Sequence, residues 1–81
     1  MANMNETVSL RRFILKRATD VSGVSGTGIV AEGVQFTDGT VALRWRSFIS
    51  SHVIYQNAKA AESVHSHGGA TKIVWLDGVA A

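Results

Sequence analysis

The stretch GIVAEGVQFTDGTVALRW, Gly28–Trp45, decides the fold, because two apolar runs within it meet at an Asp-Gly pair. Asp38 and Gly39 readily adopt the positive φ angles that a tight turn between antiparallel strands requires. From Val41 to Trp45, apolar residues then alternate with small or basic ones, which is typical of a strand with one buried face. The stretch therefore predicts a β-hairpin.

Three further segments have the composition of strands. Residues 8–19 are enriched in β-branched and aromatic residues and predict a strand, although an apolar stripe at helical spacing would also fit a helix. Residues 50–56 predict a short strand, and residues 71–77, apolar on both faces, predict a central one. Gly33, in the middle of the first hairpin strand, predicts a bulge or a sharp bend that would help a small sheet to curl.

The segment after Gln56 changes to a helical period. Asn57 is a favourable N-cap, and residues 58–67 are rich in alanine. One face of this helix would carry Ala58, Ala61, Val64 and His65. Gly68 is placed to end the helix as its C′ residue, so we expect one short helix before the last strand.

The expected element order is β-β-β-β-α-β, which predicts a mainly β fold with one helix. Short connections and the hairpin turn favour a small, curled antiparallel sheet or an SH3-like barrel. Residues 1–7 are expected to form a flexible N-terminal tail, and residues 8–81 a single small β-barrel-like domain.

Composition limits the possible classes of function. The chain has 81 residues, no cysteine and a net charge of +2, so it offers neither disulfides nor thiolate metal ligands and has only a weak basic bias. It has no apolar run long enough to span a membrane and no apolar secretory signal, and we expect a cytoplasmic protein. A small core without covalent staples often gains stability by self-association, which favours a homo-oligomer.

A glycine-rich stretch, DVSGVSGTG at residues 20–28, is the first candidate site. Its glycines have the spacing GxxGxG and lead into a strand, so it matches neither the dinucleotide fingerprint GxGxxG nor a P-loop. Successive backbone N–H groups in such a loop can still bind an anion, and hydroxyl groups would add donors. The candidate ligand-binding residues are Asp20, Ser22, Gly23, Ser25, Gly26 and Thr27. The alternative is a plain connection whose glycines only satisfy turn geometry.

Two histidines near the helix end are the second candidate. His65 and His67 would diverge by about 200° on a helix, so they cannot chelate one metal ion together. They would either complement the helix dipole or contact a phosphate or base of a ligand from the HSHGG turn. With no cysteine available, we expect no metal site and no cofactor.

A third candidate is a basic strand face. Arg44 and Arg46 share one face of the expected strand and would form either a solvated surface or a strip for phosphate groups. Arg12 and Lys16, on a neighbouring strand, would extend this strip. Both tryptophans are expected in the core, and Tyr55 either belongs to the core or stacks on a base.

Several motifs resemble those of a family of small proteins encoded by actinobacterial genomes and their phages. The shared motifs are DVSGVSGTG, VAEGV.F.DG, LRW, VH.HGGAT and VWLD, and together they extend over most of the chain. Other members carry glycine where this chain has Ser66, and a polar residue at the position of Ile14. The resemblance implies a phage or bacterial cytoplasmic setting but no particular activity.

These features favour a binding protein over an enzyme. We expect it to bind a phosphorylated or nucleotide-type ligand without chemistry, and in a phage it could sequester a nucleotide immune signal of the host. The alternative is a nucleic-acid or protein interaction module that uses the basic strand face. A small nucleotide hydrolase is a third class, although no serine has an evident base and no carboxylate pair has a readable catalytic spacing.

Overall fold

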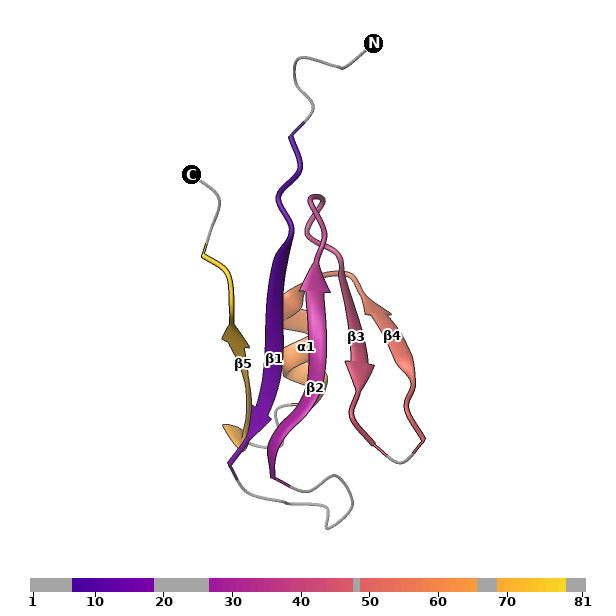
Figure 1. Ribbon diagram of the computed structural model, residues 1–81, viewed down its shortest axis with the longest axis vertical. Coiled ribbons are helices and arrows are strands. Elements are labelled where there is room, and N and C mark those ends of the chain that lie inside the picture. Colours follow the sequence, from indigo (N-terminus) through magenta and orange to yellow (C-terminus); the bar gives the residue numbers. More distant parts are fainter. Residues whose placement is uncertain (1–6, 19–26, 48, 66–68, 79–81) are drawn as a thin grey trace.

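Within the described residues, five strands form one antiparallel sheet, and a short helix lies across one of its faces (Figure 1). The structure is a computed structural model that describes residues 7–18, 27–47, 49–65 and 69–78. The strands are β1 (Arg11–Arg17), β2 (Gly28–Gln35), β3 (Val41–Trp45), β4 (His52–Tyr55) and β5 (Thr71–Trp75). With the helix α1 (Ala58–His65), the predicted mainly β fold and its order β-β-β-β-α-β are confirmed.

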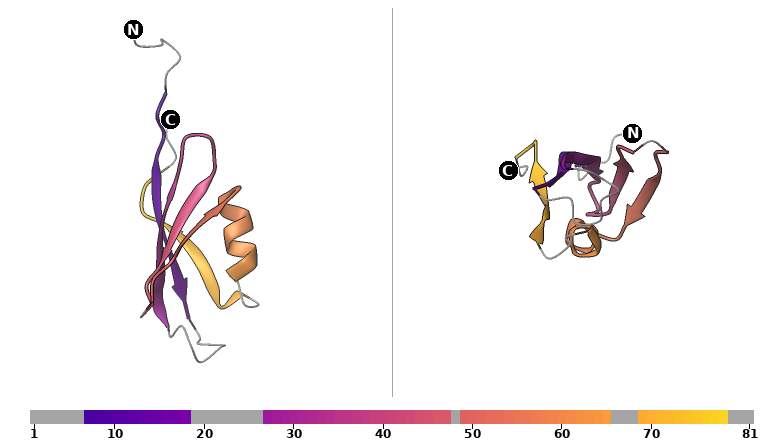
Figure 2. Two further views of the ribbon diagram at one scale, coloured as in Figure 1. Left: turned by 90° about the vertical axis from the view of Figure 1, so that its right-hand side faces the viewer. Right: turned by 90° about the horizontal axis from the view of Figure 1, so that it is seen from below.

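The sheet is open, so the predicted barrel or curled sheet is wrong. The strand order is β4-β3-β2-β1-β5, which makes β4 and β5 the two edges. The helix contacts both edge strands and lies between them (Figure 2), and Glu62 Oε2 accepts a hydrogen bond from the Ile73 amide of β5 at 2.9 Å. The expectation that residues 71–77 form a central strand is also wrong, because β5 pairs only with β1 in the described sheet and Val74 stays 40% exposed.

The turn at Asp38–Gly39 joins β2 to β3 and confirms the predicted hairpin. The Phe36 amide donates to the Thr40 carbonyl at 2.8 Å, and the Gly39 amide donates to the Phe36 carbonyl at 2.9 Å. Gly39 has a φ of 93°, a conformation that favours glycine. Asp38 Oδ1 accepts hydrogen bonds from the hydroxyl and the amide of Thr40, at 2.6 Å and 3.0 Å, and these bonds lower the pKa of the Asp38 carboxyl.

A bulge lies in β2 at Val30 and not at Gly33, so the predicted position is wrong. Leu15 of β1 pairs with Ala31, and the next residue, Lys16, pairs with Ile29. Val30 is therefore the extra residue of the bulge. Val30 and Ala31 are consequently both buried, although neighbours in a regular strand point to opposite faces. Gly33 instead leaves space for a side chain of the core.

The core lies between the sheet and α1. Its buried members are Phe13, Leu15, Val30, Ala31, Val41, Leu43 and Ala61. Gly33 lies opposite Phe13 across β1–β2, and a Cβ at position 33 would overlap the Phe13 ring. The Phe13 ring meets the Trp75 ring edge to face, with centroids 5.2 Å apart. Trp75, Trp45 and Tyr55 pack against this cluster, which confirms the expectation that both tryptophans belong to the core.

The helix begins at its predicted cap. Asn57 Oδ1 accepts a hydrogen bond from the Ala60 amide at 2.7 Å, which satisfies one of the free amides of the first turn. Ala61 is fully buried against the sheet, whereas Val64, which was predicted to share its helix face, is 63% exposed. The predicted C′ residue, Gly68, lies outside the described residues, as does most of the predicted tail.

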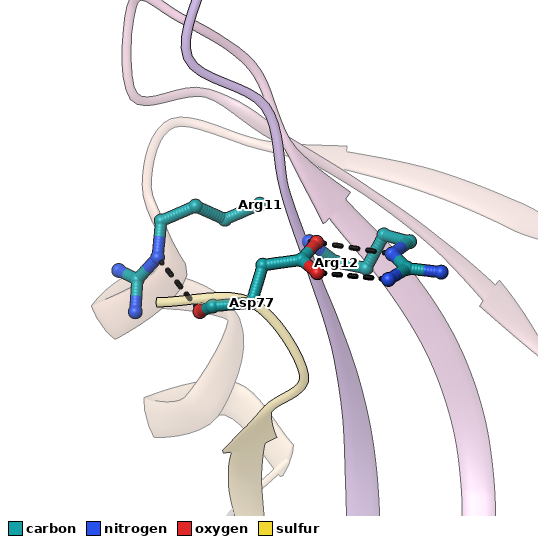
Figure 3. A network of polar contacts seen from close by, with 3 residues as sticks. All are labelled: Arg11, Arg12 and Asp77. Atoms are coloured by element: carbon teal, nitrogen blue, oxygen red, sulfur yellow. Dashed lines mark hydrogen bonds and ion pairs between the residues drawn. The ribbon is translucent and has the colours of Figure 1, made fainter. Parts of the chain in front are cut away.

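Polar contacts hold the segment after β5 against β1 (Figure 3). The Asp77 carboxylate accepts a hydrogen bond from the Arg12 amide at 2.8 Å and binds the Arg12 guanidinium at 2.8 Å and 3.0 Å. Arg11 Nε donates to the Asp77 carbonyl at 3.4 Å, and the Arg11 guanidinium lies 3.8 Å from the centroid of Trp75. The hydrogen bonds from Arg12 are the main reason why the pKa of the Asp77 carboxyl falls to about 2.

Candidate functional site

Both predicted ligand segments leave the sheet at the same end. Residues 19–26 follow β1 and precede β2, whereas residues 66–68 connect α1 to β5. Their attachment points are joined, because Arg17 pairs with Thr71 across β1–β5 and the Ala18 amide donates to the Ala70 carbonyl at 2.8 Å. Figure 1 shows this junction at the lower end of the sheet. The fold therefore brings together the attachment points of two segments that are distant in the sequence.

Some of the predicted site residues lie on the described part of the chain. Thr27 is exposed immediately before β2, and Arg46 is exposed immediately after β3, so both lie at this lower end (Figure 1). His65 is the last residue of α1, which also ends here. The other predicted residues lie outside the described ranges: Asp20, Ser22, Gly23, Ser25, Gly26 and His67.

The predicted basic strip is interrupted by carboxylates. Arg44 is exposed on the sheet face turned away from α1, but Glu32 is its direct partner across β2–β3. These two residues, together with His52, border a cavity of about 240 Å³. The Arg12 guanidinium is bound to the Asp77 carboxylate. Each of these arginines therefore has an acidic group beside it, which weakens the local positive potential.

A pair of lysines lies at the junction of β1 and β5. Lys16 is directly opposite Lys72, on the sheet face turned away from α1. Both residues are exposed and border a cavity of about 330 Å³. The rest of the lining is formed by Ala18, Gly69, Ala70 and Val74. Lys72 could not be found from the sequence, because strands far apart in the chain reveal no pairing before the register is known.

Arg17 places a further cation at this end, on the α1 side of the sheet. Its side chain is 2% exposed, and its Nε donates to Thr71 Oγ1 at 2.7 Å. Nη1 is buried and has no hydrogen-bond partner among the described residues. No carboxylate in those residues forms an ion pair with Arg17 either. A buried guanidinium is costly unless an anion or hydrogen-bond acceptors satisfy it, so this end of the sheet is suited to a negatively charged group.

Residues 7–18, 27–47, 49–65 and 69–78 contain no group of three or more His, Cys, Asp or Glu side chains that could hold a metal ion. In the same ranges, no helix has both the length and the apolar character that a membrane crossing requires.

The fold and this end of the sheet define a small antiparallel β-sheet protein with a cationic candidate binding site. A family model described as Acb5 phage protein matches residues 10–77, and the chain therefore belongs to the Acb5 phage protein family. The expected phage setting is thereby confirmed. No curated protein and no solved structure matches the chain.

Proposed function

We propose that this phage protein binds a phosphorylated, nucleotide-type molecule without changing it, and thereby sequesters a nucleotide immune signal of the bacterial host. The observation that carries the proposal is the joint position of the two attachment points beside a pair of exposed lysines on one face of the sheet, with the buried Arg17 on the other face. Lys16, Lys72 and Arg17 lie at this end without an ion-paired carboxylate in the described residues. Phosphate groups are the anions that such lysines and arginines commonly bind.

The family name also supports the binding of a nucleotide. Acb names suggest the binding of nucleotide signals against the CBASS defence. Sequestration requires a binding pocket and no catalytic group. A glycine-rich loop supplies backbone N–H groups for phosphate oxygens, which is the chemistry that we assign to Ser22–Thr27.

The alternative, an interaction module for nucleic acid or protein on the basic strand face, is less well supported. A nucleic-acid surface needs a continuous run of positive charge along the phosphate backbone of its partner. Arg44 faces Glu32, and Arg12 is neutralised by Asp77, so the described strand face lacks that run.

We also propose that the protein is a homo-oligomer in the cytoplasm of the infected cell. The sheet face turned away from α1 exposes apolar side chains, with exposed fractions of 67% for Ile54 and 42% for Ile29. Burying such side chains against another copy would add apolar contact area to a small core.

Isothermal titration calorimetry tests the proposed function directly. The panel comprises cyclic dinucleotides, cyclic trinucleotides and ADP-ribose-type nucleotides. We expect stoichiometric heat with at least one of them, and recovery of the unchanged nucleotide after denaturation of the protein. Absence of heat with every nucleotide contradicts the proposal, and appearance of a cleaved product would identify a hydrolase instead.

A further inference from the structure

The Lys16–Lys72 cavity differs from the rest of the sheet surface in its charge. We propose that Lys16 and Lys72 form the subsite that holds a phosphate group of the bound nucleotide. This assignment rests on the proposed function and names the part of the site that receives the negative charge.

Two like charges face each other directly at this cavity. Lys16 and Lys72 are cross-strand partners in an antiparallel pair, where side chains on one face come close together. Like charges at such positions destabilise a sheet. Among the described residues, none that lines the cavity carries a carboxylate. A phosphate group between the two ammonium groups removes the repulsion and gains a charge-assisted hydrogen bond from each side.

The size and lining of the cavity are suited to a small ligand. Its volume of about 330 Å³ lies near the lower end of the range of small-molecule sites, about 300–1,000 Å³. The non-basic lining is small or apolar, and Val74 offers an exposed apolar surface for a sugar or a base. These dimensions suit one nucleotide unit held at its phosphate.

The cavity lies at the residues to which the predicted ligand segments are attached. Ala18 and Gly69 both line it, and they are the residues at which the described chain leads into residues 19–26 and out of residues 66–68. Gly69 has a φ of 97°, and a Cβ built on it would meet none of the described residues within 4 Å. A phosphate held by the two lysines therefore lies next to the residues at which both segments are attached.

The test uses the full chain and two probes, inorganic phosphate and AMP, in an NMR titration of backbone amides at low ionic strength. We compare the wild type with the double variant Lys16→Gln/Lys72→Gln. Lys59→Gln is the matched control, because Lys59 is an exposed lysine of α1 that does not line the cavity. Sodium chloride at equal ionic strength controls for general screening.

We expect both probes to shift the amide signals of Ala18, Gly69 and Ala70 in the wild type and in the Lys59 variant. In the double variant, the affinity for both probes should fall about tenfold or more, because two charge-assisted hydrogen bonds are lost. Equal affinities in the wild type and the double variant, or shifts spread over all lysines, overturn the proposal.

Thermal unfolding gives an independent readout. Without phosphate, we expect the double variant to have a melting temperature equal to or above that of the wild type, because a like-charge pair has been removed. With phosphate, the melting temperature of the wild type should rise while that of the double variant stays unchanged, since only the wild type gains binding free energy. An equal rise in both proteins overturns the proposal.

The experiments distinguish a failure of the phosphate subsite from a failure of the proposed function. If the double variant binds a nucleotide of the calorimetric panel as tightly as the wild type, the subsite is refuted while the function stands. If no nucleotide binds the wild type, the function fails whatever inorganic phosphate does. Tighter binding of a single-stranded oligonucleotide than of AMP, with a steep salt dependence that the double variant lacks, overturns the nucleotide assignment.

Discussion

The Ala18 amide donates to the Ala70 carbonyl at 2.8 Å, and this hydrogen bond joins the residue that leads into the glycine-rich segment to the residue that follows the HSHGG turn. Neither segment is a recognised nucleotide motif by itself. Their common attachment point lies beside a cavity with two lysines, and this arrangement directs the functional interpretation towards phosphate.

Replacing Ser25 by tryptophan is expected to abolish nucleotide binding and to leave the fold intact. A bulky ring in the middle of the glycine-rich segment would block the approach of a ligand to the N–H groups of the loop. Calorimetry measures the binding, and circular dichroism with thermal unfolding measures the fold. Gln56→Trp is the control, because Gln56 is exposed between β4 and α1 at the other end of the sheet. Undiminished binding by Ser25→Trp would show that the segment is only a turn.

Replacing Gly33 by alanine is expected to lower the free energy of unfolding by about 1–3 kcal/mol, because the new Cβ would overlap the Phe13 ring. Urea denaturation measures the change. Gly78→Ala is the control and should stay within about 0.5 kcal/mol of the wild type, since nothing lies within 4 Å of a Cβ at Gly78. Phe13→Leu in the Gly33→Ala background should recover part of the loss. Equal stability of the two single alanine variants would refute the close approach.

Acid should destabilise the protein through Asp77. The folded-state pKa of its carboxyl is about 2, below the ordinary value of 3.8. A depressed folded pKa contributes stability above the unfolded value, and this contribution is lost as the pH falls towards the folded value. The free energy of unfolding should therefore fall between about pH 5 and pH 2. In Asp77→Asn, urea denaturation across this range should show a smaller fall, and an identical pH dependence would speak against the Arg12–Asp77 pair.

Replacing Arg17 by methionine is expected to leave the free energy of unfolding unchanged or to raise it by up to about 2 kcal/mol. Methionine fills a similar volume and removes a buried cation whose Nη1 lacks a partner in the described residues, which offsets the loss of the hydrogen bond from Arg17 Nε to the buried Thr71 hydroxyl. Arg11→Met is the control and should lose about 0.5–1 kcal/mol with the contact on Trp75. A loss of about 3 kcal/mol or more in Arg17→Met would indicate instead that a buried anion elsewhere in the chain pairs with Arg17.

Much of the fold could be predicted from local chemistry. The turn at Asp38–Gly39 and the cap at Asn57 are confirmed because each depends on residues within four positions of one another. The predictions of a barrel and of a central strand at residues 71–77 are wrong, because both depend on how strands that are distant in the sequence are placed in the sheet. In the structure α1 contacts both edge strands, and its Glu62 accepts a hydrogen bond from β5. Apolar residues on both faces of a strand do not distinguish a central strand from an edge with an exposed face.

The candidate site could likewise be predicted only where it depends on local sequence. The glycine-rich segment and the HSHGG turn could be selected from their composition, whereas their shared attachment point depends on the antiparallel register of β1 and β5. The partnership of Lys16 with Lys72 depends on the same register. The predicted strip of Arg12 and Arg44 looked continuous because their acidic neighbours, Asp77 and Glu32, come from other parts of the chain.

Native mass spectrometry of the protein purified from phage-infected host cells tests the central claim most directly. It reports the oligomeric state and any retained small molecule in one spectrum. We expect an assembly of more than one chain that carries a molecule of nucleotide mass, released unchanged on denaturation. A protein that carries no such molecule, and that takes none up when nucleotides are added, would contradict the assignment as a nucleotide-sequestering protein.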